Sequence, residues 1–519
     1  MCKFILSVVL VLIYAGTSAN NVSLTNTSVV NNPTATGKVI QFDLSWENSW
    51  RTSSTNNYDG VWVFFKFKDL DGKWYPLRFN GSNITMPAGF ARDMGSNAGA
   101  TGVGIFIYRS ANGFGTSTAT AIRAGIESFP GTFEIRGFAI EMVYIPAGAF
   151  YLGDGYSGSA YQNGSTGNNP YQVTNVGSSI TPGSSVGNLY DPLTGSLNSF
   201  ANYPVAFNAY WMMKYELSQG GYRDFLNTLT YTQQSNRVSN SPNGGIGSNT
   251  NPIGGAYRQY IEIVTPGVSS TTPAVYGCDA SADNVCNGPA DGEWVAVSLL
   301  NYADAAAYLD WAGLRPMSEF EYEKACRGPL VPVAGEYAWG TNGIASHTYN
   351  LADAFMNSEA ISNPSAVFGN AINTNAGYSN YTRGGIFATA ISTRISAGAG
   401  YYGVLDLSGN AIESVVTSGN IAGRSYTGRH GDGYLTSVGN ANENYWPGVN
   451  GATGTAVSAG IYDGFDGVRS DGGEAYKGGH IISPTSNLLV SHRFITGAGS
   501  ATLISRSFIY GIRGVRDAN

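Results

Sequence analysis

Seven short blocks in the last two thirds of the chain constrain its fold more than any other feature. They are, in order, Glu141-Met-Val-Tyr-Ile-Pro-Ala-Gly, Lys214-Tyr-Glu-Leu-Ser, Leu314-Arg-Pro-Met-Ser-Glu-Phe-Glu-Tyr-Glu-Lys-Ala-Cys-Arg-Gly, Tyr337-Ala-Trp-Gly, Gly403-Val-Leu-Asp-Leu-Ser-Gly-Asn-Ala-Ile-Glu, Lys477-Gly-Gly and Gly511-Ile-Arg-Gly. Glycine-rich stretches without a clear hydrophobic period separate these blocks. The pattern therefore predicts much irregular backbone rather than long helices or strands.

Charge and length limit what the chain can do. Only 12% of the residues are charged, 69 are Gly and 33 are Tyr, and the formal net charge is −7 without any run of Lys or Arg. Nucleic acid and anionic membranes are therefore poor partners for this surface. A chain of 519 residues exceeds what one hydrophobic core usually supports, which predicts two or more domains.

The N-terminus has the order of a secretory signal. Lys3 precedes an apolar run from Phe4 to Tyr14, and the small residues Ala15-Gly-Thr-Ser-Ala follow. We expect cleavage after Ala19, so that residues 1–19 are a signal peptide and the mature protein is extracellular or on the cell surface. No stretch reaches the roughly 18 to 20 apolar residues of a membrane helix, so no membrane insertion is expected.

Residues 20–137 carry the short period of β-structure. Val39 to Trp46 alternates apolar and polar residues, and the run Val61 to Lys68 is followed by the turn Asp71-Gly72, which predicts a hairpin. Further strands are expected at Gly104 to Tyr108 and at Thr132 to Arg136. Short strands at regular spacing, without a helical stretch, predict a β-sandwich of roughly immunoglobulin size.

Residues 138–519 form the second predicted domain, which begins with a strand from Ile140 to Leu152. Helices are expected at Glu216 to Leu229, Asn301 to Trp311 and Glu319 to Arg327, the last with a capping box made by Ser318 and Glu321. An insertion from Gly153 to about Asn198 follows the first strand.

Two further stretches, Thr232 to Pro273 and Asn357 to Gly400, lack clear periodicity and are too long for ordinary connections. They are either surface insertions that carry contacts or poorly ordered segments. Their Tyr, Ile and Val content favours ordered insertions, because disordered segments are usually poorer in such residues.

In their shared order the seven blocks resemble the formylglycine-generating enzyme, or sulfatase-modifying-factor, domain family. Arg315-Pro-Met-Ser-Glu-Phe-Glu-Tyr-Glu is similar to the family's Arg-Leu-Pro-Thr-Glu-Ala-Glu-Trp-Glu, and Gly409-Asn-Ala-Ile-Glu to its Gly-Asn-Val/Ala-Trp-Glu. The resemblance covers roughly Ile140 to Val515 and implies a C-type-lectin-like fold. The expected fold class is α+β, mostly irregular and β: an N-terminal immunoglobulin-like β-sandwich, followed by a sulfatase-modifying-factor domain with long insertions.

The resemblance also implies calcium as a structural cofactor. Carried over from the family, one ion would bind a side-chain oxygen of Asp406, the backbone carbonyls of Gly409 and Ala411, and the carboxylate of Glu413. Oxygen ligands of this kind suit calcium. The alternative is that Asp406 merely caps a turn and that Glu413 is solvated.

A second calcium ion would use Asn350 and the carbonyl of Leu351, with partners between Asn375 and Phe387 that cannot be aligned. The acidic stretch Asp463 to Asp471 departs from the ligand spacing of an EF-hand. It is therefore interpreted as a polar surface turn.

Family enzymes oxidise a substrate cysteine with a copper ion that two cysteines hold. Counted from Gly478-Gly479, these positions fall on Ser483 and Leu488, and neither can replace a thiolate for copper(I), which prefers soft sulfur. A nucleophilic Ser483 would need His480 or His492 as its base, and no acidic orienter accompanies them at a telling spacing. No catalytic residue is therefore assigned.

The remaining metal-binding and thiol residues are few. His347 and His430 lie far from the other two histidines, and without a His-x-x-x-His pair an iron oxygenase is disfavoured. Cys278 and Cys286 flank one polar loop, which predicts a disulfide in an oxidising compartment. Cys326 falls on the inner face of the third helix and is interpreted as a buried packing thiol.

These features favour a secreted, non-catalytic binding or structural protein on a sulfatase-modifying-factor scaffold. Tyr-rich loops suit recognition of a protein or a carbohydrate, whereas exposed edges of neutral strands could join copies of the chain into an extracellular filament or surface layer. The alternative is a formylglycine-generating or related metal-dependent oxidase with a different residue set. Redox-active metal would indicate the enzyme, and calcium alone the binding protein.

Overall fold

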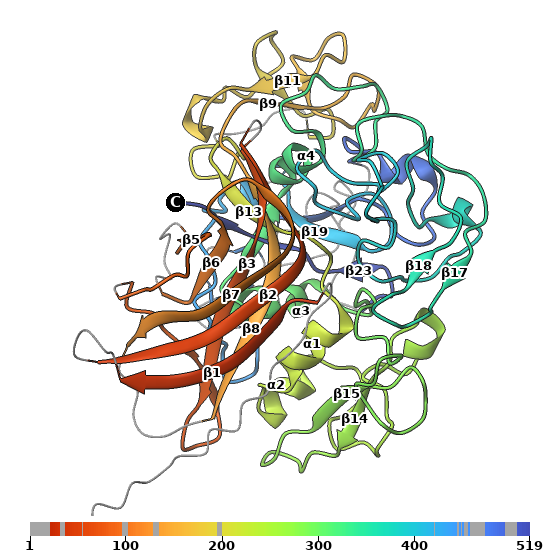
Figure 1. Ribbon diagram of the computed structural model, residues 1–519. Helices are drawn as coiled ribbons and strands as arrows, with labels where there is room; N and C mark the ends of the chain where they lie inside the picture. The colour runs from red at the N-terminus through yellow and green to blue at the C-terminus, as the bar shows by residue number, and fades with distance from the viewer. Residues whose placement is uncertain are drawn as a thin grey trace, which may run out of the picture.

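The computed structural model describes residues 21–31, 37–53, 56–81, 83–95, 102–127, 134–194, 200–419, 421–443, 446–447, 449–450, 455–456, 473–493 and 506–519 (Figure 1). The predicted signal peptide and the stretch Asp463 to Asp471 lie outside these residues. Within the described ranges, none of the helices has the length and hydrophobicity that crossing a bilayer requires.

Strands and irregular backbone dominate the fold, and helices are few, as the sequence predicts. The strands are β1 (Ser23–Asn31), β2 (Lys38–Thr52), β3 (Asn57–Lys68), β4 (Trp74–Leu77), β5 (Phe90–Asp93), β6 (Gly104–Arg109), β7 (Gly113–Ile126), β8 (Ile135–Ile145), β9 (Phe150–Leu152), β10 (Gln162–Asn163), β11 (Tyr171–Val173), β12 (Leu189–Tyr190), β13 (Tyr210–Met213), β14 (Ile261–Thr265), β15 (Val275–Cys278), β16 (Arg315–Ser318), β17 (Leu351–Ala352), β18 (Ala360–Ile361), β19 (Ile412–Val416), β20 (Val449–Asn450), β21 (Thr455–Ala456), β22 (Glu474–Lys477), β23 (Tyr510–Gly511) and β24 (Gly514–Asp517). The helices are α1 (Gln219–Leu226), α2 (Tyr231–Ser235), α3 (Tyr302–Trp311), α4 (Glu319–Arg327) and α5 (Ile421–Arg424), with 3-10 turns η1 (Gly177–Ser179), η2 (Gly254–Tyr257), η3 (Thr374–Ala376) and η5 (Thr485–Leu488).

The N-terminal strands form two layers around a core of their own. In the outer layer β2 pairs with β1 and β7, and in the inner layer β3 pairs with β4, β6 and β8, all antiparallel. Alternate residues of β2 and β3 point into the space between the layers, which explains the alternation in the sequence of β2. The buried residues there include Ile40, Phe42, Leu44 and Trp46 from β2 and Val61, Val63 and Phe65 from β3.

The inner layer is also covered on its second face. Trp62 and Phe64 of β3 point away from the outer layer into the main core of the molecule, where Phe64 packs edge-on against Trp311 of α3 with ring centroids 5.1 Å apart. Phe106 of β6 stacks on Trp211 of β13 at 4.5 Å. Because both faces of β3 are buried, its sequence is an unbroken apolar run from Val61 to Phe65.

β8 joins the two predicted domains. It pairs along most of its length with β3 and, through residues 142–145, with β13 of the second domain. From β13 the sheet continues through β24, β16, β19 and β22. The predicted boundary between residues 137 and 138 falls inside β8, so the two parts share one sheet, and Figure 1 shows the N-terminal strands packed beside the rest of the chain.

The acidic residues of the longest block are fold-forming contacts. The predicted capping box is present, because the Ser318 hydroxyl accepts the Glu321 N–H at 3.1 Å and the Glu321 carboxylate accepts the Ser318 N–H at 2.8 Å. Glu321 also binds Arg315 at 2.6 Å, and Glu319 binds Arg493 at 2.9 Å. These carboxylates are buried and paired, as buried charges must be.

The three predicted helices correspond to α1, α3 and α4, whereas the short helices α2 and α5 were not expected. The insertion that follows the first strand contains β10, β11, η1 and β12. All residues of the two stretches 232–273 and 357–400 are described and contain β14, η2, β18 and η3, in agreement with ordered insertions.

Candidate functional site

The predicted first calcium site lies in a buried, charged part of the core. Glu413 on β19 is buried, and its Oε1 accepts a hydrogen bond from Arg513 while its Oε2 has no hydrogen-bond partner among the described residues. Burial raises the pKa of Glu413 to about 7, and Arg513 opposes that rise. The alternative of a solvated Glu413 is therefore wrong.

Asp406 faces the same region. Its backbone is left-handed, with φ at 60°, and its Oδ2 accepts the N–H of Gly385. Burial raises the pKa of Asp406, whereas Gly385, Arg513 and Arg383 lower it. The carboxylate therefore bonds to a separate loop, which a simple turn cap at residue 406 would not explain.

Glu216, just before α1, is a third carboxylate in this cluster. Its Oε1 accepts the N–H of Ala411 at 2.7 Å, and its Oε2 accepts the side-chain amide of Asn410. Burial raises the pKa of Glu216 well above its usual range, and the charges of Asp406 and Glu413 raise it further. Sequence reasoning missed Glu216 and Arg513 as members of the site, although both lie in the quoted blocks.

The side chains in this cluster supply part of a ligand set for a divalent cation. The carboxylates of Glu216, Asp406 and Glu413 face the buried guanidinium of Arg513, with Arg383 as a further cation. Burial raises the pKa of all three carboxyl groups, so a bound cation would favour their ionised forms. The orphaned oxygen of Glu413 is an acceptor that such an ion would satisfy. In the described ranges, no three His, Cys, Asp or Glu side chains converge as a metal site, so an ion here would rely on backbone carbonyls as well.

The residues of the second predicted calcium site are part of a small hairpin. The carbonyl of Asn350 accepts the N–H of Ser362 at 2.9 Å, and Leu351 pairs with Ile361 across β17 and β18. The neighbouring Tyr349 donates its N–H to the carbonyl of Ala376, which lies in the segment where the missing partners were expected.

The positions that correspond to the copper cysteines hold packing and loop residues. Ser483 is buried, and its hydroxyl accepts the backbone N–H of His480 at 3.0 Å. The ring Nδ1 of His480 accepts the N–H of Ile482 at 3.4 Å. Leu488 is fully buried in a hydrophobic cluster with Trp339. Neither position offers a soft ligand, and the Ser483 hydroxyl is bound to the backbone of its own loop.

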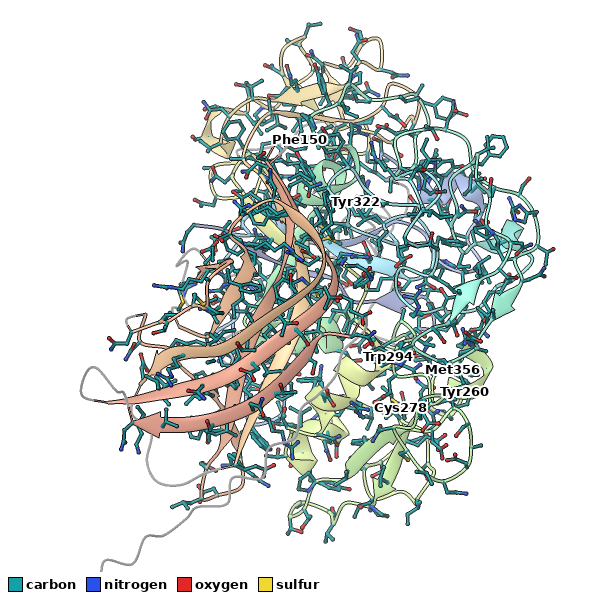
Figure 2. All side chains as sticks on the ribbon, in the orientation of Figure 1. Phe150, Tyr260, Cys278, Trp294, Tyr322 and Met356 are labelled. Atoms are coloured by element: carbon teal, nitrogen blue, oxygen red, sulfur yellow. The ribbon has the colours of Figure 1, made fainter. Side chains whose placement is uncertain are left out.

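The structure has no disulfide between Cys278 and Cys286, which are both free thiols. Cys278 on β15 is buried in the main core, near Tyr260 in the lower part of Figure 2. A side chain added at Gly277 would meet the sulfur of Cys286 at 3.1 Å, so Cys286 lies on the opposite face of the strand. The third cysteine, Cys326, is buried as predicted.

A groove runs along the contact between the N-terminal strands and the second domain. This seam groove has a volume of about 770 Å³, within the range of small-molecule binding sites. One wall comes from Asn21, residues 47–50, Asn57, Phe114 and Gly115, and the other from Lys214, Tyr215, Asn357 and residues between 383 and 405. Sequence reasoning did not find it, because its walls lie up to several hundred positions apart in the chain.

Trp50 connects the two walls. Its indole N–H donates to the side-chain oxygen of Asn57 at 3.2 Å, and the ammonium of Lys214 lies 4.8 Å from its ring. A Cβ at Gly403 would lie 2.9 Å from the indole, so only glycine lets this loop approach so closely. Lys214 is itself bound to Glu141 at 2.8 Å and to Asp59 at 3.4 Å.

One comparison with known proteins gives a match. A family model, the sulfatase-modifying factor enzyme 1-like domain, matches residues 134–517. No curated protein matches the chain. The match begins at the start of β8 and leaves β1 to β7 outside it.

Proposed function

The chain belongs to the sulfatase-modifying factor enzyme 1-like family, and on this premise we propose that it is a secreted, non-catalytic binding protein whose ligand occupies the seam groove. The observation that carries the proposal is the groove itself. It is about 770 Å³ in volume, and one wall is built by β2 and β7, which precede the family domain. Phe114 on that wall is 75% exposed and offers the groove an apolar ring.

Calcium has a structural part in this proposal. The side chains of Asp406 and Glu413, with the carbonyls of Gly409 and Ala411, would hold one ion, which would offset the repulsion between these carboxylates and Glu216. Asn350 and Leu351 remain the proposed start of a second site. A bound calcium ion supplies charge and rigidity to the second wall of the groove, since Asp406 bonds directly to Gly385, which lines it.

A formylglycine-generating or related oxidase receives less support from the residues. Ser483 and Leu488 stand where sulfur ligands would be needed, and both side chains are already committed to loop and core contacts. An oxidase would have to use a different residue set.

Self-assembly is a second candidate, favoured by one strand. β1 carries no charged residue and pairs with β2 and with no other strand among the described residues, so its second edge is open to another chain. Electron microscopy and light scattering of the purified protein test this idea. Val30→Lys should abolish assembly, whereas filaments that persist in this variant would exclude β1 as the contact.

The main test is metal analysis of the secreted protein together with an activity assay. We expect calcium without stoichiometric copper or iron, and no oxidation of a cysteine-containing peptide. Stoichiometric copper together with turnover of that peptide would establish the oxidase and overturn the proposal.

A further inference from the structure

We propose that the ligand of the seam groove is a short neutral oligosaccharide. The inference rests on the proposed binding function and names its ligand class. It depends on three properties of the groove walls: an exposed aromatic ring, Phe114, beside the partly buried Trp50; a set of side-chain amides; and cations that already donate to groups of the protein.

The aromatic pair lies on the strand wall. Trp50 of β2 and Phe114 of β7 are directly opposite in the antiparallel register, so their side chains project from the same face. Phe114 is 75% exposed, whereas Trp50 is held in place by Asn57 and Lys214. A sugar ring presents an apolar face of C–H groups and a polar rim, and it therefore packs on such a flat apolar ring while its hydroxyls remain free to bond.

The amides lie around this pair and provide both donors and acceptors. Asn57 uses its side-chain oxygen for Trp50, which leaves its NH2 group, and Asn357 uses its NH2 group for Asn21, which leaves its oxygen. Asn48 makes no side-chain hydrogen bond to any described residue and is exposed. Amides can bond both lone pairs and protons of sugar hydroxyls, which a carboxylate or an ammonium group alone cannot do.

The cations of the groove are already committed within the protein. Lys214 is paired with Glu141 and Asp59. Arg394 donates to the carbonyls of Cys326, Ala338 and Ala399, and Arg383, which also lines the groove, donates to the carbonyls of Glu359 and Gly384. Both keep their charge, but to bind an anion through these donors they would have to leave the protein's own carbonyls. Glu47, which accepts from Asn21 at 2.8 Å, repels an anion. These contacts favour a neutral ligand.

An extended peptide fits the strand wall less well. A peptide that joins a sheet needs free backbone N–H and C=O groups. At the groove, residues 49–51 of β2 pair with residues 113–115 of β7, and Arg51 also pairs with Tyr58 of β3. On the other edge of β7, the carbonyls of Gly115 and Thr116 accept hydrogen bonds from Arg109. The wall therefore offers side chains rather than backbone for recognition.

The test uses the full secreted chain on an array that carries neutral oligosaccharides, acidic oligosaccharides and a random peptide set, followed by calorimetric titration of the best neutral oligosaccharide. Phe114→Ala should weaken binding about tenfold, because the stacking surface is lost. Asn48→Gly removes an amide but keeps the left-handed backbone at φ 52°, and a loss of about fivefold is expected. Leu70→Ala, at a 91% exposed position in the β3–β4 turn outside the groove, is the matched control and should bind as the parent does.

The outcomes separate this inference from the proposed function. Binding to peptides or acidic oligosaccharides alone would overturn the neutral sugar and leave a binding protein. Neutral sugar binding that is unchanged in both Phe114→Ala and Asn48→Gly would remove the groove as its site. A folded protein that binds no probe would count against the sugar, while stoichiometric copper with peptide oxidation would count against the binding function itself.

Discussion

At the residue scale, Glu413 has two oxygens in different surroundings. One is bound to Arg513, and the other is buried and has no hydrogen-bond partner in the part of the chain that the structure describes. If calcium binds here, saturating calcium should raise the melting temperature, since an ion that binds only the native state adds about 2.7 kcal/mol at one hundred times its dissociation constant. Glu413→Gln should lose most of this calcium-dependent shift in a thermal melt with and without chelator.

The comparison needs a matched variant, because Glu413→Gln also removes a partner of Arg513 and lowers the baseline stability. Glu262→Gln changes a carboxylate on the separate β14–β15 hairpin. Burial raises the pKa of Glu262 to about 7 as well. It should retain the full calcium shift. A full shift in Glu413→Gln would show that this carboxylate is not a ligand.

His430 gives a pH prediction at the same scale. It is fully buried, and its Nε2 accepts the N–H of Asp517 at 3.1 Å. Burial and the charges of Arg516 and Arg315 lower the pKa of His430. They outweigh the Asp517 carboxylate, which lies 3.4 Å from the same nitrogen and raises this pKa, and so favour the neutral ring. Burial lowers its pKa to about 4, from 6.5. The unfolded chain therefore binds a proton at this residue between pH 6.5 and 4 that the native protein does not. The associated stability is present above pH 6.5 and is lost as the pH falls toward 4.

The fall in the pKa of His430 from 6.5 to about 4 corresponds to a loss of roughly 3 kcal/mol in the free energy of unfolding between these pH values. Carboxylates with raised pKa values, such as Glu141 at about 7, act in the opposite direction, so the parent protein alone cannot isolate it. In denaturant unfolding from pH 7 to 4, His430→Gln should lose less stability than the parent. Parallel curves for the two proteins would contradict a neutral His430.

The sequence predicted some members of the charged cluster and not others, for a physical reason. Asp406 and Glu413 share one block, so their proximity is local. Glu216 and Arg513 reach them from two other blocks, through β13, α1 and β24, and no spacing in the sequence reports such a contact. The cysteine prediction was wrong for a related reason. The short loop brings Cys286 close to β15, but Cys286 lies on the face of the strand that Gly277 faces, whereas the side chain of Cys278 points to the opposite face.

At the element scale, α4 is the helix that local chemistry defines best. Its limits, Glu319 to Arg327, are those predicted, because Ser318 and Glu321 satisfy each other's backbone N–H groups. The Ser318 hydroxyl also donates to the carbonyl of Pro204 at 2.7 Å. Ser318→Ala should therefore lower the free energy of unfolding by about 1 to 2 kcal/mol in chemical denaturation.

The helix α2 offers the comparison for this cap. Thr230 and Gln233 form the same capping box, but α2 has only five residues, of which Gln234 alone is buried. Thr230→Ala should cost less than Ser318→Ala, since few buried contacts depend on α2. Equal losses in the two variants would mean that the cap itself, rather than the anchoring of α4, sets the cost.

Elements with a clear local signal could be predicted, and those fixed by distant contacts could not. The alternating residues of β2 and the turn after β3 were sufficient to locate these strands. Short strands such as β10, β11 and β12 have two or three residues each and no period of their own. Their pairing depends on the rest of the fold, which a single stretch of sequence does not encode.

At the scale of the whole molecule, the two predicted domains are joined more closely than the sequence suggests. Sequence reasoning recognised β-structure before residue 137 and the family domain after it. It could not show that β3 is buried on both faces or that β8 pairs with strands on each side. The unbroken apolar run in β3 is the signal for this arrangement, because a strand with one solvated face would alternate instead.

This shared core predicts that the N-terminal strands do not fold alone. In a fragment of residues 20–137, Trp62, Phe64 and Phe106 would be exposed, because their partners in the second domain, such as Trp211, are missing. Each large apolar side chain left in water costs about 1.5 to 3 kcal/mol. Three such side chains together cost about 4.5 to 9 kcal/mol, which is comparable with the whole stability of a typical domain, about 5 to 15 kcal/mol. The fragment should therefore aggregate or bind a hydrophobic dye without a cooperative melt.

The full chain should unfold in one calorimetric transition whose measured and van't Hoff enthalpies agree. Two separate transitions in the full chain, with the lower one reproduced by a soluble fragment, would show that the shared sheet does not couple the two parts.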